Sequence, residues 1–306
     1  MGTPEFAVPI LKGLAQGGYN IAGVYTQPDE PAGRGRKVVP SPVKKAALSI
    51  GLNVRQPVSL KQKEEVERLR ELGPGLVVVA AYAQILPKAV LDVPPRGCLN
   101  IHPSLLPRHR GPSPVAAAIR AGDKVTGVSV MLMDERMDTG PVLAQKRLPL
   151  LDWDTTGSLT EKLADLGAQL LMDTLPLWLE AKVEPQPQDE ANATYSGLIR
   201  KEDGRMDWTR SALELWRQVR AFQPWPGCYT TWRSRLLKII ECVPLAGSGK
   251  AGEVRQLDPN QEAPIGMVTG DGVLGLLKLQ LEGKRIVTAD EFLRGHQEFV
   301  GSVLPS

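Results

Sequence analysis

The first 181 residues alternate between short apolar runs and longer stretches with an apolar residue every three or four positions. The apolar runs predict strands and the amphipathic stretches predict helices. The expected strands are residues 21–26, 76–80, 98–102, 127–132 and 142–148. The expected helices are residues 5–17, 42–50, 60–72, 113–121 and 156–179, with Ser41 capping the second. Such alternation predicts an α/β fold with a mostly parallel sheet and helices on both faces.

The pattern changes after Ala181. Residues 184–194 are polar and contain two prolines, which is typical of a linker. A helix is expected over 211–222, and strands are expected over 230–232, 236–243, 266–269 and 273–281. Thr269-Gly-Asp-Gly272 is a hairpin signal between the last two. We therefore expect a small barrel or sandwich over 205–306, joined by a linker over 184–204 to a first domain over 1–183.

Composition narrows the class of protein. The 306 residues are 42% apolar and 23% charged, as in an ordinary globular protein. The net charge is only +3, so the overall charge of the chain does not predict a polyanionic partner. The three cysteines (Cys98, Cys228, Cys242) are far apart, which predicts reduced thiols in a cytoplasmic protein and no metal site. The longest apolar run, residues 76–86, is too short for a bilayer, so we expect no membrane association. We expect a monomer.

The candidate chemistry lies at Asn100, His102 and Asp138. Asn100 and His102 are two residues apart at the end of an expected strand, hence on one face, where open α/β sheets bind their ligands. Asp138 lies in a turn between two expected strands. An amide that donates to an oxyanion, an imidazole that moves protons and a carboxylate that orients it can perform acyl transfer without a covalent intermediate. The alternatives are a hydrogen-bonded core histidine beside a turn asparagine, and an ordinary turn aspartate.

Three other stretches are candidates for binding. Residues 34–45 contain five basic residues and no acidic one, which suits either phosphates and guanine edges or plain solvation. Residues 80–87 follow a buried strand and either line a ligand slot or simply connect a strand to a helix. The tryptophans Trp208, Trp216 and Trp232, with nearby basic residues, suit either stacking on nucleic acid or core packing.

Taken together, these stretches resemble the methionyl-tRNA formyltransferase family over the whole length. The matching segments are residues 2–7, 26–29, 31–36, 82–87, 100–107, 110–111, 138–140, 222–227 and 269–272. The resemblance implies a Rossmann-like formyltransferase sheet, a smaller OB-like β-barrel domain and 10-formyltetrahydrofolate as formyl donor. It also implies initiator methionyl-tRNA as acceptor, with Asn100 and His102 stabilising the oxyanion and Asp138 setting the charge of His102.

The resemblance further implies two sets of binding residues and no metal. The folate donor would be held by Tyr82, Ile85, Leu86, Pro87, Ser104, Leu105, Leu106 and Pro107. The tRNA would be held by Arg34, Arg36 and Lys37. The alternative is another formyltetrahydrofolate-dependent enzyme that acts on an amino sugar or a ribonucleotide amine. A third possibility is a nucleic-acid-binding protein without activity.

The chain departs from the family pattern at three places. His109 replaces an aromatic residue and Ala83 replaces a glycine, which affects the rim of the pocket. Family members also carry an apolar strand before Gly2-Thr3-Pro4, where this chain has only Met1. Because the loss of a central strand would leave backbone groups of its neighbours unpaired, we expect the recorded start to be internal and upstream codons to encode that strand.

Overall fold

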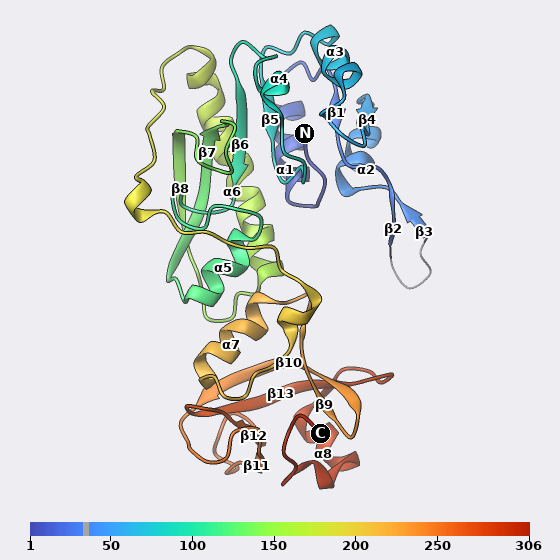
Figure 1. Cartoon of the computed structure of the whole chain (residues 1–306), viewed down its shortest axis with the longest axis vertical. Coiled ribbons are helices and arrows are strands. Elements are labelled where there is room, and N and C mark those ends of the chain that lie inside the picture. Colours follow the sequence, from blue (N-terminus) through green and yellow to red (C-terminus); the bar gives the residue numbers. More distant parts are fainter. Residues whose placement is uncertain (33–36) are drawn as a thin grey trace. The chain divides into compact units, whose positions relative to one another are not determined.

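The computed structural model of the protein describes residues 1–32 and 37–306. The chain forms two compact units. The first unit comprises residues 1–114, 124–149 and 159–197, and the second comprises residues 115–123, 150–158 and 198–306. Each unit has its own sheet (Figure 1).

The first unit contains a four-stranded sheet and a separate parallel pair. The sheet has the order β5 (Val77–Val79), β6 (Cys98–His102), β7 (Val125–Leu132) and β8 (Val142–Pro149). Its β5–β6 pairing is parallel, whereas β6–β7 and β7–β8 are antiparallel. The parallel pair is β1 (Val24–Tyr25) with β4 (Val54–Arg55). The α/β class expected from the sequence is confirmed, and β7 runs antiparallel to β6 within it.

Met1 and Gly2 connect these two groups of strands. The Gly2 amide donates to the Tyr25 carbonyl at 2.9 Å, and the Ala80 amide donates to the Met1 carbonyl at 2.9 Å. The ammonium of Met1 donates to the Val78 carbonyl at 2.6 Å, and burial lowers the pKa of this ammonium to about 5. The parallel β5–β6 pair and the β1–β4 pair are therefore joined through the first two residues. A cavity of about 370 Å³, lined largely by apolar side chains, adjoins this junction.

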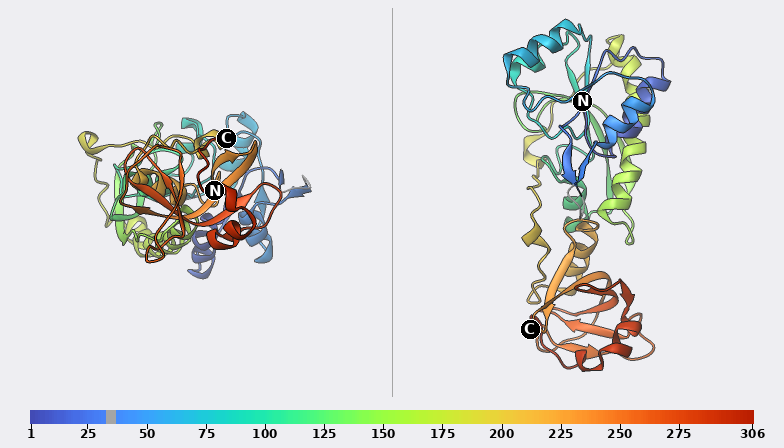
Figure 2. Two further views of the ribbon diagram at one scale, coloured as in Figure 1. Left: turned by 90° about the horizontal axis from the view of Figure 1, so that it is seen from below. Right: turned by 90° about the vertical axis from the view of Figure 1, so that its right-hand side faces the viewer.

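Helices cover both faces of the first unit (Figure 2). On one face lie α1 (Ala7–Gln16), α2 (Pro42–Ser49) and most of α6 (Thr156–Leu179). A Cβ on Gly167 of α6 would lie 2.9 Å from the side chain of Ile101, so α6 approaches β6 closely. On the other face, α3 (Lys63–Glu71) and α4 (Lys88–Leu91) contribute to a core cluster. This cluster contains Tyr25, Leu60, Val66, Leu69, Val77, Val79, Tyr82, Leu86, Val90 and Cys98.

Two short strands lie where the sequence pattern predicts only a loop. β2 (Glu30–Ala32) and β3 (Lys37–Val39) pair in antiparallel fashion. Ser41 caps α2 by accepting from the Lys44 amide at 3.1 Å, as its position in the sequence predicts. The Lys44 ammonium pairs with the carboxylate of Asp29, so the segment before β2 is attached to the start of α2.

The second unit is a curled antiparallel sheet with helices. Its strands are β9 (Cys228–Trp232), β10 (Arg235–Leu245), β11 (Val254–Gln256), β12 (Ile265–Val268), β13 (Val273–Leu281) and β14 (Val287–Thr288). They follow the order β11-β12-β13-β10-β9, with β14 also paired to β13. The helices α5 (Pro114–Ala121), α7 (Ala212–Ala221) and α8 (Ala289–Gly295) lie wholly or mostly in this unit. The predicted hairpin between β12 and β13 is confirmed, as is the barrel-like form.

Aromatic side chains form one part of the core of the second unit. Trp208 and Trp232 are buried, and the ring of Trp232 lies within 5.8 Å of Phe292 and 5.1 Å of Phe299 between centroids. Of the two interpretations of these tryptophans, core packing therefore applies to Trp208 and Trp232. Trp225, in contrast, is 57% exposed.

All three cysteines are free and buried. Burial raises the pKa of the Cys98 thiol to about 12 and that of the Cys228 thiol to about 12, and it raises the pKa of Cys242 as well. The prediction of reduced thiols is thus confirmed, and none of the three is poised to act as a nucleophile.

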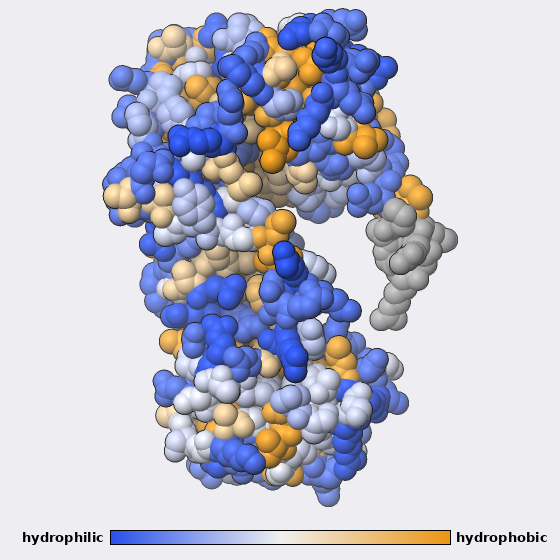
Figure 3. Space-filling view, viewed as in Figure 1, coloured by the Kyte–Doolittle hydropathy of each residue, from blue (hydrophilic) through white to orange (hydrophobic). Residues whose placement is uncertain are grey.

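Hydrophilic residues predominate on the face of the molecule that Figure 3 shows, and hydrophobic residues lie there in small groups. Within residues 1–32 and 37–306, no helix has the length and apolar character needed to cross a membrane.

Candidate active site

β6 carries Asn100 and His102 at its carboxyl end. The strand is buried between β5 and β7, and it ends at His102, before Pro103. In the antiparallel pairing with β7, Asn100 lies opposite Met131 and His102 lies opposite Ser129. His102 is 4% exposed, so its imidazole is almost completely removed from water.

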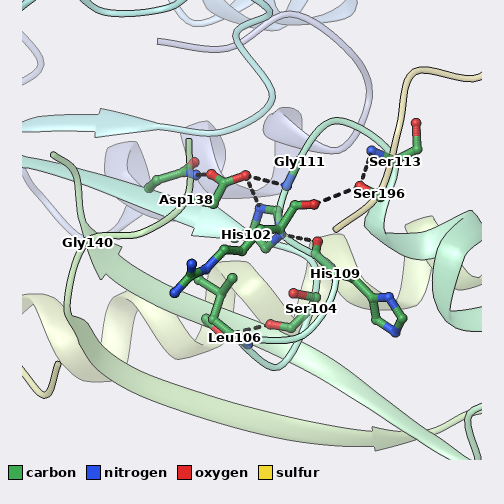
Figure 4. A network of polar contacts seen from close by, with 12 residues as sticks. His102, Ser104, Leu106, His109, Gly111, Ser113, Asp138, Gly140 and Ser196 are labelled. Carbon is green, nitrogen blue, oxygen red and sulfur yellow. Dashed lines mark hydrogen bonds and ion pairs between the residues drawn. The ribbon is translucent and has the colours of Figure 1, made fainter. Parts of the chain in front are cut away.

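Asp138 joins these two side chains from the β7–β8 connection (Figure 4). The Asn100 amide donates to Asp138 Oδ1 at 3.3 Å, and His102 Nδ1 lies 3.7 Å from Asp138 Oδ2. The Gly111 amide also donates to Oδ2, at 2.8 Å. The structure therefore brings together the amide, imidazole and carboxylate that the sequence singled out. Asp138 has a φ of 55°, which places the backbone of this residue in the left-handed region.

The hydrogen bonds of His102 define its tautomer. His102 Nε2 lies 3.1 Å from the carbonyl oxygen of His109, and a carbonyl can only accept, so Nε2 carries a hydrogen. Nδ1, which faces Asp138, is then the nitrogen that gains or loses a proton. Burial lowers the pKa of His102 below 6.5, and the smaller influence of the Asp138 charge raises it. The carboxylate acts in the expected direction, but burial outweighs it and the imidazole is neutral at pH 7.

The loop from Ser104 to Arg110 is fixed on β7 and β8. Ser129 Oγ donates to the Ser104 carbonyl at 2.6 Å and accepts from the Leu106 amide at 3.1 Å. Gln145 Nε2 donates to the Leu106 carbonyl at 2.8 Å. These bonds hold the loop that delivers the His109 carbonyl to the imidazole of His102.

The residues expected to hold folate differ in their exposure. Ile85 is 71% exposed, and Pro87, Leu105 and Pro107 are half-buried. Tyr82, Leu86, Ser104 and Leu106 are buried, so their side chains shape the surrounding structure. The Tyr82 carbonyl is already used, because it accepts from Thr3 Oγ1 at 3.2 Å and from Gln27 Nε2 at 3.0 Å.

Ala83 adopts a φ of 64°, a conformation that glycine enters without strain. Ala83, at the position where the resemblance expects glycine, therefore lies in the left-handed region that glycine favours. The rim of the candidate folate site keeps a sharp bend between Tyr82 and Ile85.

The residues expected to bind tRNA are only partly described. Arg34 and Arg36 lie outside the described residues, and Lys37 is described only as the first backbone position of β3. The base of this segment is well anchored, since Gln56 Nε2 donates to Asp29 Oδ1 at 2.6 Å and to the Gln27 carbonyl at 2.8 Å.

Three residues near the site were not singled out for a role from the sequence. Gly111 holds the carboxylate of Asp138, and a Cβ at this position would lie 2.5 Å from the Ser196 carbonyl. Arg110 and Gln188 lie behind the Asp138 turn. Gln188 belongs to the polar segment that the sequence predicts as a linker, and no local pattern connects it with Asp138.

Among the described residues, no group of three or more His, Cys, Asp or Glu side chains is arranged to hold a metal ion.

Comparison with known proteins places the chain among enzymes of one-carbon transfer. Residues 1–175 match the family model described as formyl transferase, and residues 198–297 match the formyl transferase C-terminal domain. The chain is 49% identical over 303 residues to the methionyl-tRNA formyltransferase of Dehalococcoides mccartyi strain BAV1, covering 98% of this chain and 95% of the relative. It is 46% identical over 302 residues to that of Myxococcus xanthus, with coverage of 99% and 96%.

A solved structure shares the fold. HypX from Aquifex aeolicus, in complex with tetrahydrofolic acid, matches with a TM-score of 0.58 at 22% identity. The match covers 84% of this chain and 44% of HypX, so the chain spans less than half of that protein.

Proposed function

Because this chain belongs to the formyl transferase family, we propose that it transfers a formyl group to the α-amine of initiator methionyl-tRNA for translation initiation. The donor is 10-formyltetrahydrofolate. The observation that carries the proposal is the convergence of Asn100, His102 and Asp138 at the end of β6. The acceptor is supported by the relatives at 46% and 49% identity, which bear that name over nearly their full length. A folate-derived donor is supported by the tetrahydrofolate bound to HypX.

The reaction needs no covalent intermediate on the protein. The amine nitrogen attacks the formyl carbon, and a tetrahedral intermediate with a negatively charged oxygen forms. The bond from this carbon to N10 of the folate then breaks, its electron pair stays on N10, and the proton lost by the amine is delivered there. Water is not consumed, so the site has to exclude it rather than position it.

Each of the three side chains has a task in this sequence. One N–H of the Asn100 amide donates to Asp138, which leaves the other N–H free to donate to the oxyanion. The bare Nδ1 of His102 faces Asp138 Oδ2 and accepts the amine proton. The imidazolium so formed is stabilised by the carboxylate and contributes positive charge near the oxyanion. The same proton then passes to N10.

The pH dependence of transfer follows from the state of His102. Since burial lowers its pKa below 6.5, Nδ1 is available at neutral pH and becomes protonated only as the pH falls below that value. The attacking α-amine must be unprotonated and titrates near about pH 8, so it gives kcat/KM an acid limb of its own. We expect His102 to add a second limb whose midpoint lies below 6.5. Asp138→Asn removes the charge that raises the pKa of His102, so this second limb moves to still lower pH. Initial rates between pH 5 and 9, with the limb of the amine known from its own titration, give the His102 midpoint in both proteins, and a His102 midpoint above 6.5 in the unaltered protein would contradict this assignment.

The acceptor is tested by comparing two amines. Arg34→Ala is expected to lower kcat/KM for methionyl-tRNA by roughly ten- to hundredfold, as for a lost guanidinium contact to nucleic acid. Transfer to a free small amine is expected to stay unchanged. Lys12→Ala is the control, because Lys12 is an exposed base on α1, outside the basic stretch of residues 34–45. Equal use of tRNA by Arg34→Ala, together with transfer to an amino sugar, would favour the alternative acceptor.

A further inference from the structure

We infer that Gln188 and Arg110 are positioning residues that hold the Asp138 turn against His102, an inference that rests on the proposed function. Neither side chain faces the reacting groups. Both lie behind the turn, on or against a strap formed by residues 186–196. The strap begins where Gln186 pairs with Val142, at the start of β8.

Gln188 fastens the turn through two carbonyls at once. Its Nε2 donates to the Asp138 carbonyl at 2.9 Å and to the Gly140 carbonyl at 2.7 Å. These two carbonyls flank Thr139, so a single amide group fixes the turn on both sides. The clamp matters because Asp138 has a φ of 55°, a conformation that a residue with a Cβ keeps only when its surroundings enforce it.

Arg110 fixes the orientation of that amide. Its Nε donates to Gln188 Oε1 at 3.0 Å, which turns the Gln188 Nε2 group toward the carbonyls. Its two terminal nitrogens each donate to one oxygen of Glu190 at 2.9 Å, which makes the pair bidentate. The side chain of Arg110 is 0% exposed, so this guanidinium has no solvent to replace a lost partner.

The backbone next to Arg110 completes the connection. The Arg110 amide donates to the Thr194 carbonyl at 2.9 Å, and the Ser196 amide donates to the Arg110 carbonyl at 2.7 Å. The following residue, Gly111, donates to the carboxylate of Asp138. The side chain of Asp138 is therefore bound by Gly111, and its backbone is bound by Gln188. Arg110 connects these two contacts, because it precedes Gly111 in the chain and donates to Gln188.

The consequence of loosening this clamp is electrostatic. The Asp138 charge opposes the burial that lowers the pKa of His102. If the turn relaxes and the carboxylate moves away from Nδ1, the pKa of His102 falls further. A role confined to stability would leave this pKa unchanged in the folded protein.

The test compares Gln188→Ala with Gln186→Ala. Gln186 is two positions away on the same strap, and its side chain donates to the carbonyl of Glu184, just before the strap, so its removal leaves the bonds of Gln188 intact. We expect Gln188→Ala to lower kcat for methionyl-tRNA by roughly ten- to hundredfold, as for a misplaced reacting group, with KM nearly unchanged. We expect Gln186→Ala to match the unaltered protein. Gln188→Glu accepts from Arg110 but cannot donate to the carbonyls, so it should not restore kcat.

A second readout does not depend on activity. The protonation midpoint of His102, followed by NMR and assigned from the signal missing in His102→Gln, should shift downward in Gln188→Ala but not in Gln186→Ala. Equal midpoints and equal kcat in the two variants would overturn the inference, as would a lower melting temperature of Gln188→Ala without a shift in the midpoint. If the unaltered protein fails to formylate methionyl-tRNA, the proposed function fails, whereas the NMR comparison still decides the inference.

Discussion

His102→Ala is expected to lower kcat for formyl transfer to methionyl-tRNA by roughly 10²–10⁴-fold, the range typical of a lost proton-transferring group. The variant removes the atom that takes up the amine proton in the proposed mechanism, Nδ1 at 3.7 Å from Asp138 Oδ2. The same change leaves the carboxylate without the cation it would stabilise. Single-turnover measurements with saturating donor give the rate of the chemical step directly.

Because His102 is buried, its replacement by alanine also leaves a cavity beside β6. His102→Gln fills this space and can still donate to the His109 carbonyl, but it cannot carry a proton between substrates. Both variants should therefore be slow, while His102→Gln should melt close to the unaltered protein. Full activity of His102→Gln would show that the imidazole is not the proton carrier.

Asn100→Ala is expected to lower kcat by roughly 10²–10³-fold, the loss typical of one missing donor to an oxyanion. KM for the formyl donor should change little, because the donor's ground-state carbonyl carries much less charge than the intermediate. Asn100→Asp is the sharper variant, since it keeps the size of the side chain but sets a second carboxylate against Asp138. Steady-state kinetics with varied donor concentration separate the two constants.

Asn192→Ala serves as the matched control for Asn100. Its side-chain amide donates to the neighbouring Asp189 carboxylate, at 2.6 Å, in an exposed short helix. This variant should retain the unaltered kcat. An Asn100→Ala enzyme with unchanged kcat and a raised KM would assign Asn100 to binding of the donor rather than to stabilisation of the intermediate.

Hydrophobic periodicity predicted the long elements well. α6 and β13 have the same bounds as their sequence patterns. A 24-residue amphipathic stretch and a nine-residue apolar strand are long enough for the hydrophobic pattern to show where each element begins and ends. The short elements β4, β11 and β14 have two or three residues each, and their pairing partners rather than their own sequences determine them.

The candidate site was predictable as a set of residues but not as a geometry. The spacing of Asn100 and His102 places them on one face of a strand, whereas the approach of Asp138 depends on how β7 and β8 close around it. The positions behind the turn could not be found from the sequence. Gln188 lies 50 residues from Asp138 in the chain, in a polar segment whose composition indicates only a linker. The balance between burial and charge at His102 likewise requires coordinates.

The buried cysteines allow the opening of each unit to be measured separately with an alkylating reagent. Cys98 belongs to the first unit, and Cys228 and Cys242 belong to the second. A thiol that is enclosed and keeps its proton reacts with iodoacetamide only during moments when the surrounding structure opens. The rate of carbamidomethylation at each site, read by mass spectrometry of peptides, therefore times the opening of each unit in a single sample of unlabelled protein.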